Sequence, residues 1–300
     1  MTQVTAAQVK ELRERTGAGM IDCKKALEAN GGDIDKAVEK LRMDGMAKAD
    51  KKGARVAAEG VIGSAVADDA VALVEINSET DFVSKGDDFK AFAQEVAELA
   101  LAKRPADLTA LLALDVGGQS LEDKRRAMVA KIGENIGIRR FAVVASAGGA
   151  LAHYLHGSKI GVVVALKSGD IDVARDVAMH VAASSPRFLS ADDVDAEVLA
   201  SERKIIDAQI AQEQAQDIED GKKPKPAEIL AKMAEGKLRK FVGEITLLGQ
   251  PFVKQPDQTV AQLLQAQRAE VAQFVRFAVG EGIEKQVTDF AAEVAAQAGL

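Results

Sequence analysis

An apolar stretch that runs into a polar turn, at residues 71–83, constrains the fold of this 300-residue chain most. It reads V-A-L-V-E-I-N-S-E-T-D-F-V. Residues 71–76 place apolar side chains on at least one face in the period of two that a β-strand requires. Residues 77–81 favour a turn, because their short polar side chains hydrogen-bond to nearby backbone. Connecting loops lie at the surface, so the sequence predicts a buried strand that delivers this turn to solvent.

Phe82 is a large hydrophobic residue in this predicted turn, and it has two interpretations. In the first, its ring folds under its own loop as a core residue, which composition alone favours because phenylalanine is usually buried. In the second, the ring is a wedge for a partner protein. The residues by themselves leave both interpretations open.

The composition is that of an ordinary globular protein, with 47% hydrophobic and 28% charged residues, and the length suggests about two domains. No uncharged apolar run reaches about 18 residues and the start lacks the features of a signal peptide, so we expect neither membrane insertion nor export. A single cysteine fits a reducing cytoplasm, where we expect the protein to act. The net charge of -7 argues against extensive nucleic-acid binding and favours a protein partner.

Glycines divide the beginning of the chain into three short predicted helices, at residues 6–15, 20–28 and 33–43. Their apolar residues follow three- and four-residue spacing, which is enough for a small core, so residues 1–47 are expected to form a three-helix domain. The basic run K-A-D-K-K-G-A-R follows. We expect residues 48–57 to be a solvated linker, because the run is short and has no aromatic residues between its charges.

The middle of the chain predicts two similar strand–helix subdomains with antiparallel sheets, at residues 58–138 and 139–280. Each runs from strands through an acidic turn into a helix, and the expected fold class is therefore α+β. A three-strand meander is expected in the second subdomain. The predicted strands are residues 59–67, 70–77, 141–146, 150–155, 160–167 and 271–279, and the predicted helices are residues 87–105, 121–136, 170–183 and 260–265.

A helical hairpin is predicted at residues 192–240, inserted in the second subdomain. Residues 192–220 contain neither Gly nor Pro, and the G-K-K-P-K-P that follows must turn the chain, which together predict an antiparallel coiled coil. Residues 281–300 are expected to form a C-terminal helical module. The apolar stripes are Val198, Ile205, Ala208 and Ala215; Ile229, Leu230, Met233 and Leu238; and Val287, Phe290, Ala291 and Val294.

The chain lacks the motifs of several catalytic and ligand-binding sites. There is no G-x-x-x-x-G-K-[ST], so we expect no direct nucleotide binding. His153 and His156 point to opposite faces of a predicted strand and Cys23 is remote from all three histidines in sequence, so no metal and no cofactor are expected. With no G-x-S-x-G elbow either, the sequence predicts a binding protein rather than an enzyme.

The T-D-F-V of residues 80–83 resembles the signature of elongation factor Ts, the guanine-nucleotide exchange factor family of bacterial translation. The resemblance extends over nearly the whole chain, although Ser78 stands where the family commonly has cysteine. Further similar blocks are V-K-E-L-R-E-R-T-G-A-G-M at residues 9–20, D-C-K-K-A-L at 22–27, K-I-G-E-N-I at 131–136 with Arg139 and Arg140 after it, A-M-H-V-A-A-S at 178–184, and G-E-I-T-L-L-G-Q-P-F-V at 243–253.

The resemblance implies an exchange factor that binds elongation factor Tu in its GDP form, disturbs the magnesium and phosphate site, and promotes GDP release and GTP reloading. It implies that Phe82 is the wedge, that Asp81 perturbs the surroundings of the magnesium ion, and that Thr80 and Val83 shape the loop. The three-helix domain resembles ubiquitin-associated domains and in the family grips elongation factor Tu. The family's helical arm projects from the core, and its C-terminal helix binds the partner.

Weaker contact candidates lie elsewhere in the chain, each with a structural alternative. Leu12 and Met20 are either contacts of the three-helix domain or part of its core. His156 and Gly157, in the H-G that matches the family's second contact loop, are either a contact or a hydrogen-bonded turn.

An RNA- or ribosome-associated protein without exchange activity is the alternative function. It would use the basic residues 48–55 and 222–225. The sequence leaves open whether the chain forms a homodimer.

Overall fold

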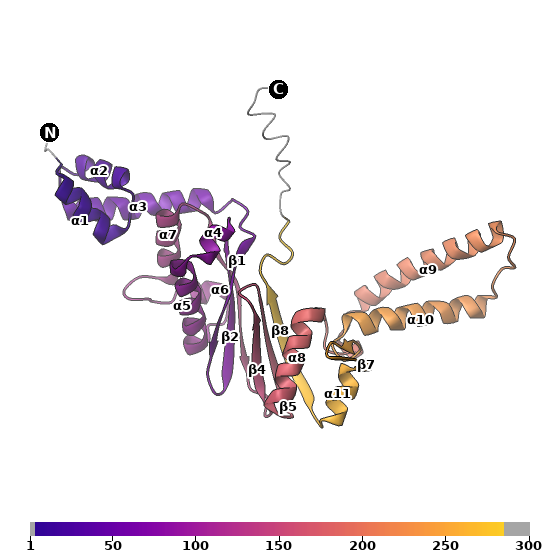
Figure 1. The fold of residues 1–300 in the computed structure, drawn as a ribbon. Helices are drawn as coiled ribbons and strands as arrows, with labels where there is room; N and C mark the ends of the chain where they lie inside the picture. Colours follow the sequence, from indigo (N-terminus) through magenta and orange to yellow (C-terminus); the bar gives the residue numbers. More distant parts are fainter. Residues whose placement is uncertain (1–3, 285–300) are drawn as a thin grey trace. The chain divides into compact units, whose positions relative to one another are not determined.

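The structure, a computed structural model, describes residues 4–284 (Figure 1). These residues divide into two compact units. The first contains residues 4–143, 157–161 and 277–284, and the second contains residues 144–156 and 162–276. Both combine helices with small sheets, which confirms the α+β class. The predicted C-terminal helix of Val287, Phe290, Ala291 and Val294 lies outside the described residues.

Three helices with a shared core begin the first unit: α1 (Ala6–Thr16), α2 (Met20–Ala29) and α3 (Ile34–Lys52). Thr5 caps α1 in a capping box with Gln8, and Asp33 caps α3 by accepting a hydrogen bond from the Lys36 backbone. Gly17 ends α1 in the left-handed conformation, with φ of 68°. The shared core contains Leu12, Cys23, Ala26, Leu27 and Ala37.

Helix α3 is longer than the sequence suggested, because residues 48–52 are helical rather than part of a connector. Alanine and lysine are good helix formers, and the added length packs against α7 (Leu121–Ile132). A Cβ placed on Gly45 would lie only 3.0 Å from the Ala130 Cβ, so the two helices approach closely at this glycine. Ala49 is buried in the main core of the unit.

The sheet of the first unit has the order β1-β2-β3. Strands β1 (Glu59–Val66) and β2 (Ala70–Ser78) form the predicted antiparallel hairpin, and every residue of β2 is buried. Helix α5 (Asp87–Lys103) covers both strands with the face that carries Phe89 and Phe92. Strand β2 is therefore a rigid central support for the turn that follows it.

Strand β3 (Ile136–Ala145) differs from the sequence prediction in start and in pairing. Gly133 ends α7 with φ of 89°, so residues 133–135, predicted as the last turn of that helix, form a connection, and the strand begins at Ile136. The expected meander is also wrong, because β3 lies beside β2 and not in the sheet of β4 and β5. Two short helices, α4 (Asp81–Lys85) and α6 (Leu108–Leu112), were not expected.

The second sheet has the order β4-β5-β8, with β4 (Leu151–His156), β5 (Ile160–Ser168) and β8 (Glu270–Ala278). Helix α8 (Ile171–Ser184) packs on β4, so two strands followed by a helix recur, as they do in β1, β2 and α5. The remaining short elements are η1 (Ala191–Asp193), β6 (Pro251–Phe252), β7 (Gln255–Thr259) and α11 (Val260–Ala266).

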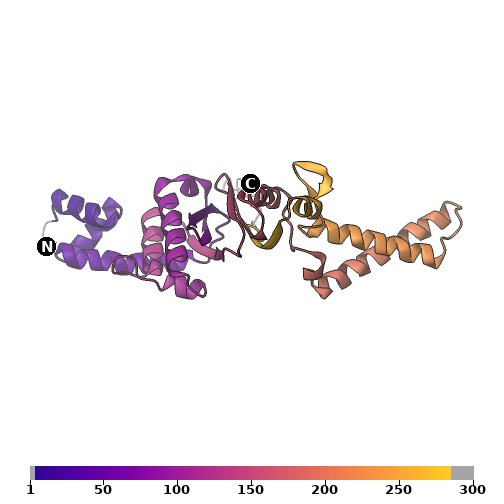
Figure 2. The same cartoon turned by 90° about the horizontal axis from the view of Figure 1, so that it is seen from below.

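Two long helices, α9 (Ala196–Glu219) and α10 (Ala227–Ile245), form a hairpin in the second unit (Figure 2). They pack through Ile206, Ile210 and Ala234, with Leu230, Met233 and Leu238 around them. The predicted stripe is therefore displaced by one residue in α9, where Ile205 is exposed and Ile206 is buried.

Replacement of residues 209–235 by a short Gly/Ser turn is expected to leave the rest of the chain folded. The hairpin cluster contains residues of α9 and α10 alone, so trimming removes no side chain from the core of the first unit. Circular dichroism melting should show the main transition within a few degrees of the wild-type value. Loss of that transition would mean that the hairpin is part of the main folding unit.

Candidate functional site

The turn after β2 is fixed by two carboxylates, that of Glu134 and that of Glu79. Thr80 caps α4, and its hydroxyl accepts a hydrogen bond from the Val83 backbone at 3.5 Å. The Thr80 backbone and hydroxyl both donate to the two carboxylate oxygens of Glu134, at 3.0 and 2.7 Å. In return, Glu79 accepts a hydrogen bond from the Asn135 backbone at 2.6 Å. These bonds join the turn to the segment between α7 and β3, so it is ordered without a partner.

Phe82 lies on the first turn of α4 with 86% of its surface exposed. Val83 packs against the main core and Ser84 is buried, so α4 holds its opposite face down while the ring of Phe82 points outward. Burial of a phenylalanine is worth about 1.5–3 kcal/mol, and this ring gains almost none of it within the chain. The structure thus rules out the interpretation of Phe82 as a core residue of the free chain.

Asp81 adds a negative charge beside the exposed ring. Its carboxylate lies 2.6 Å from the Lys85 ammonium, and this hydrogen bond and charge hold the pKa of Asp81 below its usual value. Asp81 is therefore ionised at neutral pH. The turn presents a large apolar group and a carboxylate from adjacent positions.

The large apolar residues exposed on α1, α2 and α3 are Met20, Ile21 and Met43, at 62%, 72% and 58% exposure, and the first two are adjacent. Met20 was a candidate from the sequence, whereas Ile21 was missed. The signal for Ile21 was the M-I pair in the first turn of α2, where Cys23 faces the core. Leu12 is fully buried between the helices, so its structural alternative holds and it is not a surface contact in this structure.

His156 and Gly157 lie at the end of β4, where the chain turns towards β5. The His156 ring is exposed, and its Nδ1 lies 3.1 Å from the Tyr154 hydroxyl. Gly157 has φ of 58°, a left-handed conformation that favours glycine in a tight turn. His156 thus has a hydrogen-bond partner in Tyr154, as its structural alternative expects. Its exposed ring also remains accessible to a partner protein.

Several of the basic residues considered for RNA have carboxylate partners within the chain. Lys48 pairs with Asp22 at 3.0 Å, and Lys222 pairs with Asp217 at 2.8 Å. Lys225 also binds Asp217, and hydrogen bonds from the two lysines lower the pKa of Asp217 to about 2. Intrachain pairing reduces the positive charge that phosphate neutralisation requires, so no observation here favours the RNA-binding alternative.

Residues 4–284 lack the features of two other classes of site. Within that range, no three His, Cys, Asp or Glu residues are grouped so that they could hold a metal ion. The described helices include none with the length and apolarity to cross a membrane.

An exposed aromatic ring on a rigid turn, with a second exposed apolar pair elsewhere, is typical of a protein-binding surface. The fold and the turn thus define the class as an α+β protein with a candidate protein-interaction site. The family model for elongation factor TS matches residues 79–281, a region that begins one residue before Thr80.

Curated relatives agree over almost the full length. The elongation factor Ts of Hydrogenovibrio crunogenus is 57% identical over 298 residues, and that of Alkalilimnicola ehrlichii is 56% identical over 297, each covering 98% of both chains. That of Methylococcus capsulatus is 54% identical, also over 98% of both. The chain belongs to the elongation factor Ts family and is a translation elongation factor.

Proposed function

We propose that the chain is a guanine-nucleotide exchange factor for elongation factor Tu. It binds the GDP form of that GTPase, disturbs the magnesium and phosphate site through residues 80–83, and promotes GDP release and GTP reloading. Membership of the family supports this function, and the observation that carries it is the exposed ring of Phe82 on a turn fixed by Glu134.

The proposed mechanism follows from how GTPases hold nucleotides. Backbone amides, a lysine and a magnesium ion bridge the phosphate oxygens, so distortion of the ion's surroundings removes much of the affinity. Phe82 inserts as the wedge and Asp81 perturbs the charge around the ion. Because the turn is ordered beforehand, little entropy is lost when it docks.

Thermodynamic linkage makes this effect mutual. If the factor weakens GDP binding, GDP weakens the binding of the factor by the same amount. GTP entry then displaces the factor and regenerates the loaded GTPase. Exchange therefore depends on binding alone, with no covalent step, no cofactor and no catalytic residue in this chain, and we place it in the cytoplasm.

The other parts of the chain add contact area. The three-helix domain acts as a ubiquitin-associated-like module that contacts elongation factor Tu through Met20 and Ile21. His156 and Gly157 form a second contact, and α9 and α10 form a coiled-coil arm. Tethering of several weak contacts raises the effective concentration of the wedge at its target.

The direct test is release of labelled GDP from purified elongation factor Tu, with and without the full chain. Acceleration that saturates with the concentration of the factor supports the proposal. A release rate equal to the spontaneous one at every concentration would overturn it.

Glu134→Ala is expected to lower the maximal exchange rate by about tenfold, because charge-assisted hydrogen bonds of about 1.5 kcal/mol or more that order Thr80 are lost. Glu134→Gln is the matched control. It keeps one acceptor oxygen, so its rate should fall by less. Equal rates for both variants and wild type would show that the clamp on Thr80 has no part in exchange.

A further inference from the structure

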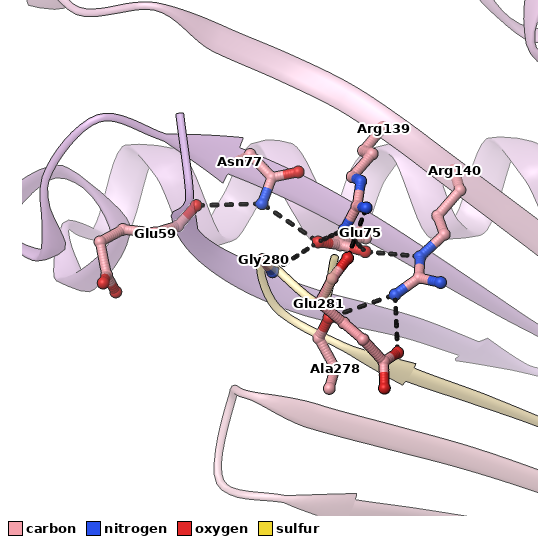
Figure 3. Close-up of polar contacts among 8 residues, drawn as sticks. All are labelled: Glu59, Glu75, Asn77, Arg139, Arg140, Ala278, Gly280 and Glu281. Carbon is pink, nitrogen blue, oxygen red and sulfur yellow. Dashed lines mark hydrogen bonds and ion pairs between the residues drawn. The ribbon is translucent and has the colours of Figure 1, made fainter. Parts of the chain in front are cut away.

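A buried carboxylate lies in the strand that leads to the Phe82 turn. Glu75 is 0% exposed in the middle of β2, among residues that are otherwise mostly apolar. It accepts hydrogen bonds from Arg139 at 3.0 Å, Arg140 at 2.6 Å, Asn77 at 3.1 Å and the Gly280 backbone at 2.8 Å (Figure 3). Both carboxylate oxygens are satisfied: Arg139 donates to Oε1 and, at 3.3 Å, to Oε2, and Arg140 donates to Oε2.

The same arginines hold the segment of residues 277–281, which returns to the first unit more than 130 residues after Arg139 and Arg140. Arg139 donates to the Glu281 carbonyl oxygen at 2.6 Å, and Arg140 donates to the Ala278 carbonyl at 3.2 Å (Figure 3). The Arg140 guanidinium also lies 4.4 Å from the centre of the Phe277 ring and 3.4 Å from the Glu281 carboxylate.

The cluster is balanced in charge, with two arginines and the carboxylates of Glu75 and Glu281. Burial alone would raise the pKa of Glu75, but the hydrogen bonds from Gly280, Arg139, Arg140 and Asn77 outweigh it and lower the pKa. A buried ion cluster of this kind is seldom more stabilising than apolar side chains of the same volume. Its hydrogen bonds, however, form only when the partners lie in a narrow range of positions. Its physical effect is therefore to fix where one segment lies on another.

The cluster is also connected to the Phe82 turn through β2. Asn77 bridges Glu75 to the Glu59 carbonyl oxygen, to which it donates at 3.1 Å. The next residue, Ser78, is buried and donates to the Thr80 carbonyl at 2.9 Å. Only residues 76–79 thus separate Glu75, whose carboxylate anchors Gly280, from Thr80, which caps α4.

We infer that Glu75 is a positioning residue, which locks residues 277–281 onto β2 and by this lock holds the Phe82 turn in its exchange-competent geometry. The inference deepens the proposed function and rests on it where exchange is concerned. The anchoring of residues 277–281 and of the turn can be measured without any GTPase.

Two readouts test the inference in the full chain carrying Glu75→Gln. Hydrogen–deuterium exchange of peptides covering residues 277–281 and 79–85 should become about tenfold faster or more, because the carboxylate that holds the Gly280 amide has lost its charge. In GDP-release assays the plateau rate should fall by about tenfold, with the half-saturating concentration within about twofold of wild type. If Glu75→Gln only reduced the fraction of folded protein, the half-saturating concentration would rise and the plateau rate would stay the same.

Glu122→Gln is the matched control for removal of a charge. Glu122 is bonded by Arg125 and Arg126 of its own helix, at 2.6 and 2.8 Å. The Glu122→Gln variant should therefore leave both readouts at wild-type values. If Glu75→Gln resembles this control in either peptide or in the plateau rate, the inference is overturned.

Gly280→Ala tests the same anchoring by changing residues 277–281 instead of β2. This variant provides the test if Glu75→Gln does not fold. A Cβ on Gly280 would lie 2.4 Å from the Ala58 carbonyl oxygen, so the segment must shift. Gly282→Ala is the control, since Gly282 shares the left-handed φ, 75° against 72°, but its Cβ would have 3.9 Å to its nearest neighbour. We expect both effects with Gly280→Ala and neither with Gly282→Ala; equal behaviour of the two would contradict the lock.

Failure of the proposed function gives a different pattern. If the wild-type chain does not accelerate GDP release, the exchange function is wrong, and the two peptides still decide the anchoring. Faster hydrogen–deuterium exchange at residues 79–85 in Glu75→Gln would then still show that Glu75 holds the Phe82 turn. Unchanged hydrogen–deuterium exchange there would show that it does not.

Discussion

Phe82→Ala is expected to abolish most of the exchange activity and to leave the fold intact. The ring is 86% exposed, so its removal creates no cavity in the free chain. A buried aromatic at the centre of an interface costs about 3 kcal/mol or more on truncation, which corresponds to a loss of more than about hundredfold. The substitution is thus expected to lower the exchange activity and to leave the stability unchanged.

The check on Phe82→Ala is a pair of measurements, GDP release and thermal melting. Val66→Ala is the control, because Val66 is also an exposed hydrophobic residue of the same unit but lies at the far end of β1 from the turn. Both variants should melt within about 2 °C of wild type. A fall of many degrees for Phe82→Ala would show that the ring is part of the core in solution.

Gly60→Ala is expected to be among the most destabilising single substitutions in the chain. Gly60 has φ of 151°, and a Cβ there would lie 2.0 Å from the Ile76 carbonyl oxygen on the paired strand. Relief of such a clash requires β1 and β2 to separate next to Asn77. We expect a loss of about 4 kcal/mol or more in the free energy of unfolding, in the range reserved for backbone strain and core disruption.

Urea denaturation measures this loss, with Gly137→Ala as the control. Gly137 also lies in a strand of the first sheet, but a Cβ on it would meet nothing within 4 Å. Its midpoint should remain close to that of wild type. A Gly60→Ala variant as stable as Gly137→Ala would mean that the β1–β2 register at this position is incorrect.

Local signals in the sequence predicted the local elements well. Glycines and capping residues placed α1, α2 and the start of α3, because a cap acts through bonds within one turn. The β1–β2 hairpin was predictable as well, because only Asp68 and Asp69 separate the predicted strands 59–67 and 70–77. The T-D-F-V stretch was expected to be a loop, whereas the threonine caps a short helix there.

Long-range pairing was not predictable from such signals. The position of β3 beside β2 depends on packing between residues about 60 positions apart, which no periodicity encodes. The partners of Glu75 were missed for the same reason, since Gly280 is 205 positions away. Likewise, the exposure of Phe82 and the burial of Leu12 follow from which neighbours cover them, and both residues are simply apolar in the sequence.

In the proposed mechanism the Phe82 turn, and not the three-helix domain, discriminates between nucleotide-bound and nucleotide-free partner. Only a group with different affinity for the two states can shift the equilibrium between them. Contact area elsewhere strengthens the complex with both forms and leaves that ratio unchanged.

The most direct test is a concentration series of labelled-GDP release from elongation factor Tu with two double variants. Asp81→Asn/Phe82→Ala should lower the plateau rate, because the discriminating contact is lost. Met20→Ser/Ile21→Ser should move the curve to higher concentration and reach the wild-type plateau, because contact area alone is lost. The reverse pattern, a lowered plateau for the Met20 and Ile21 variant and a shifted curve for the Phe82 variant, would contradict the account and place the wedge in the three-helix domain.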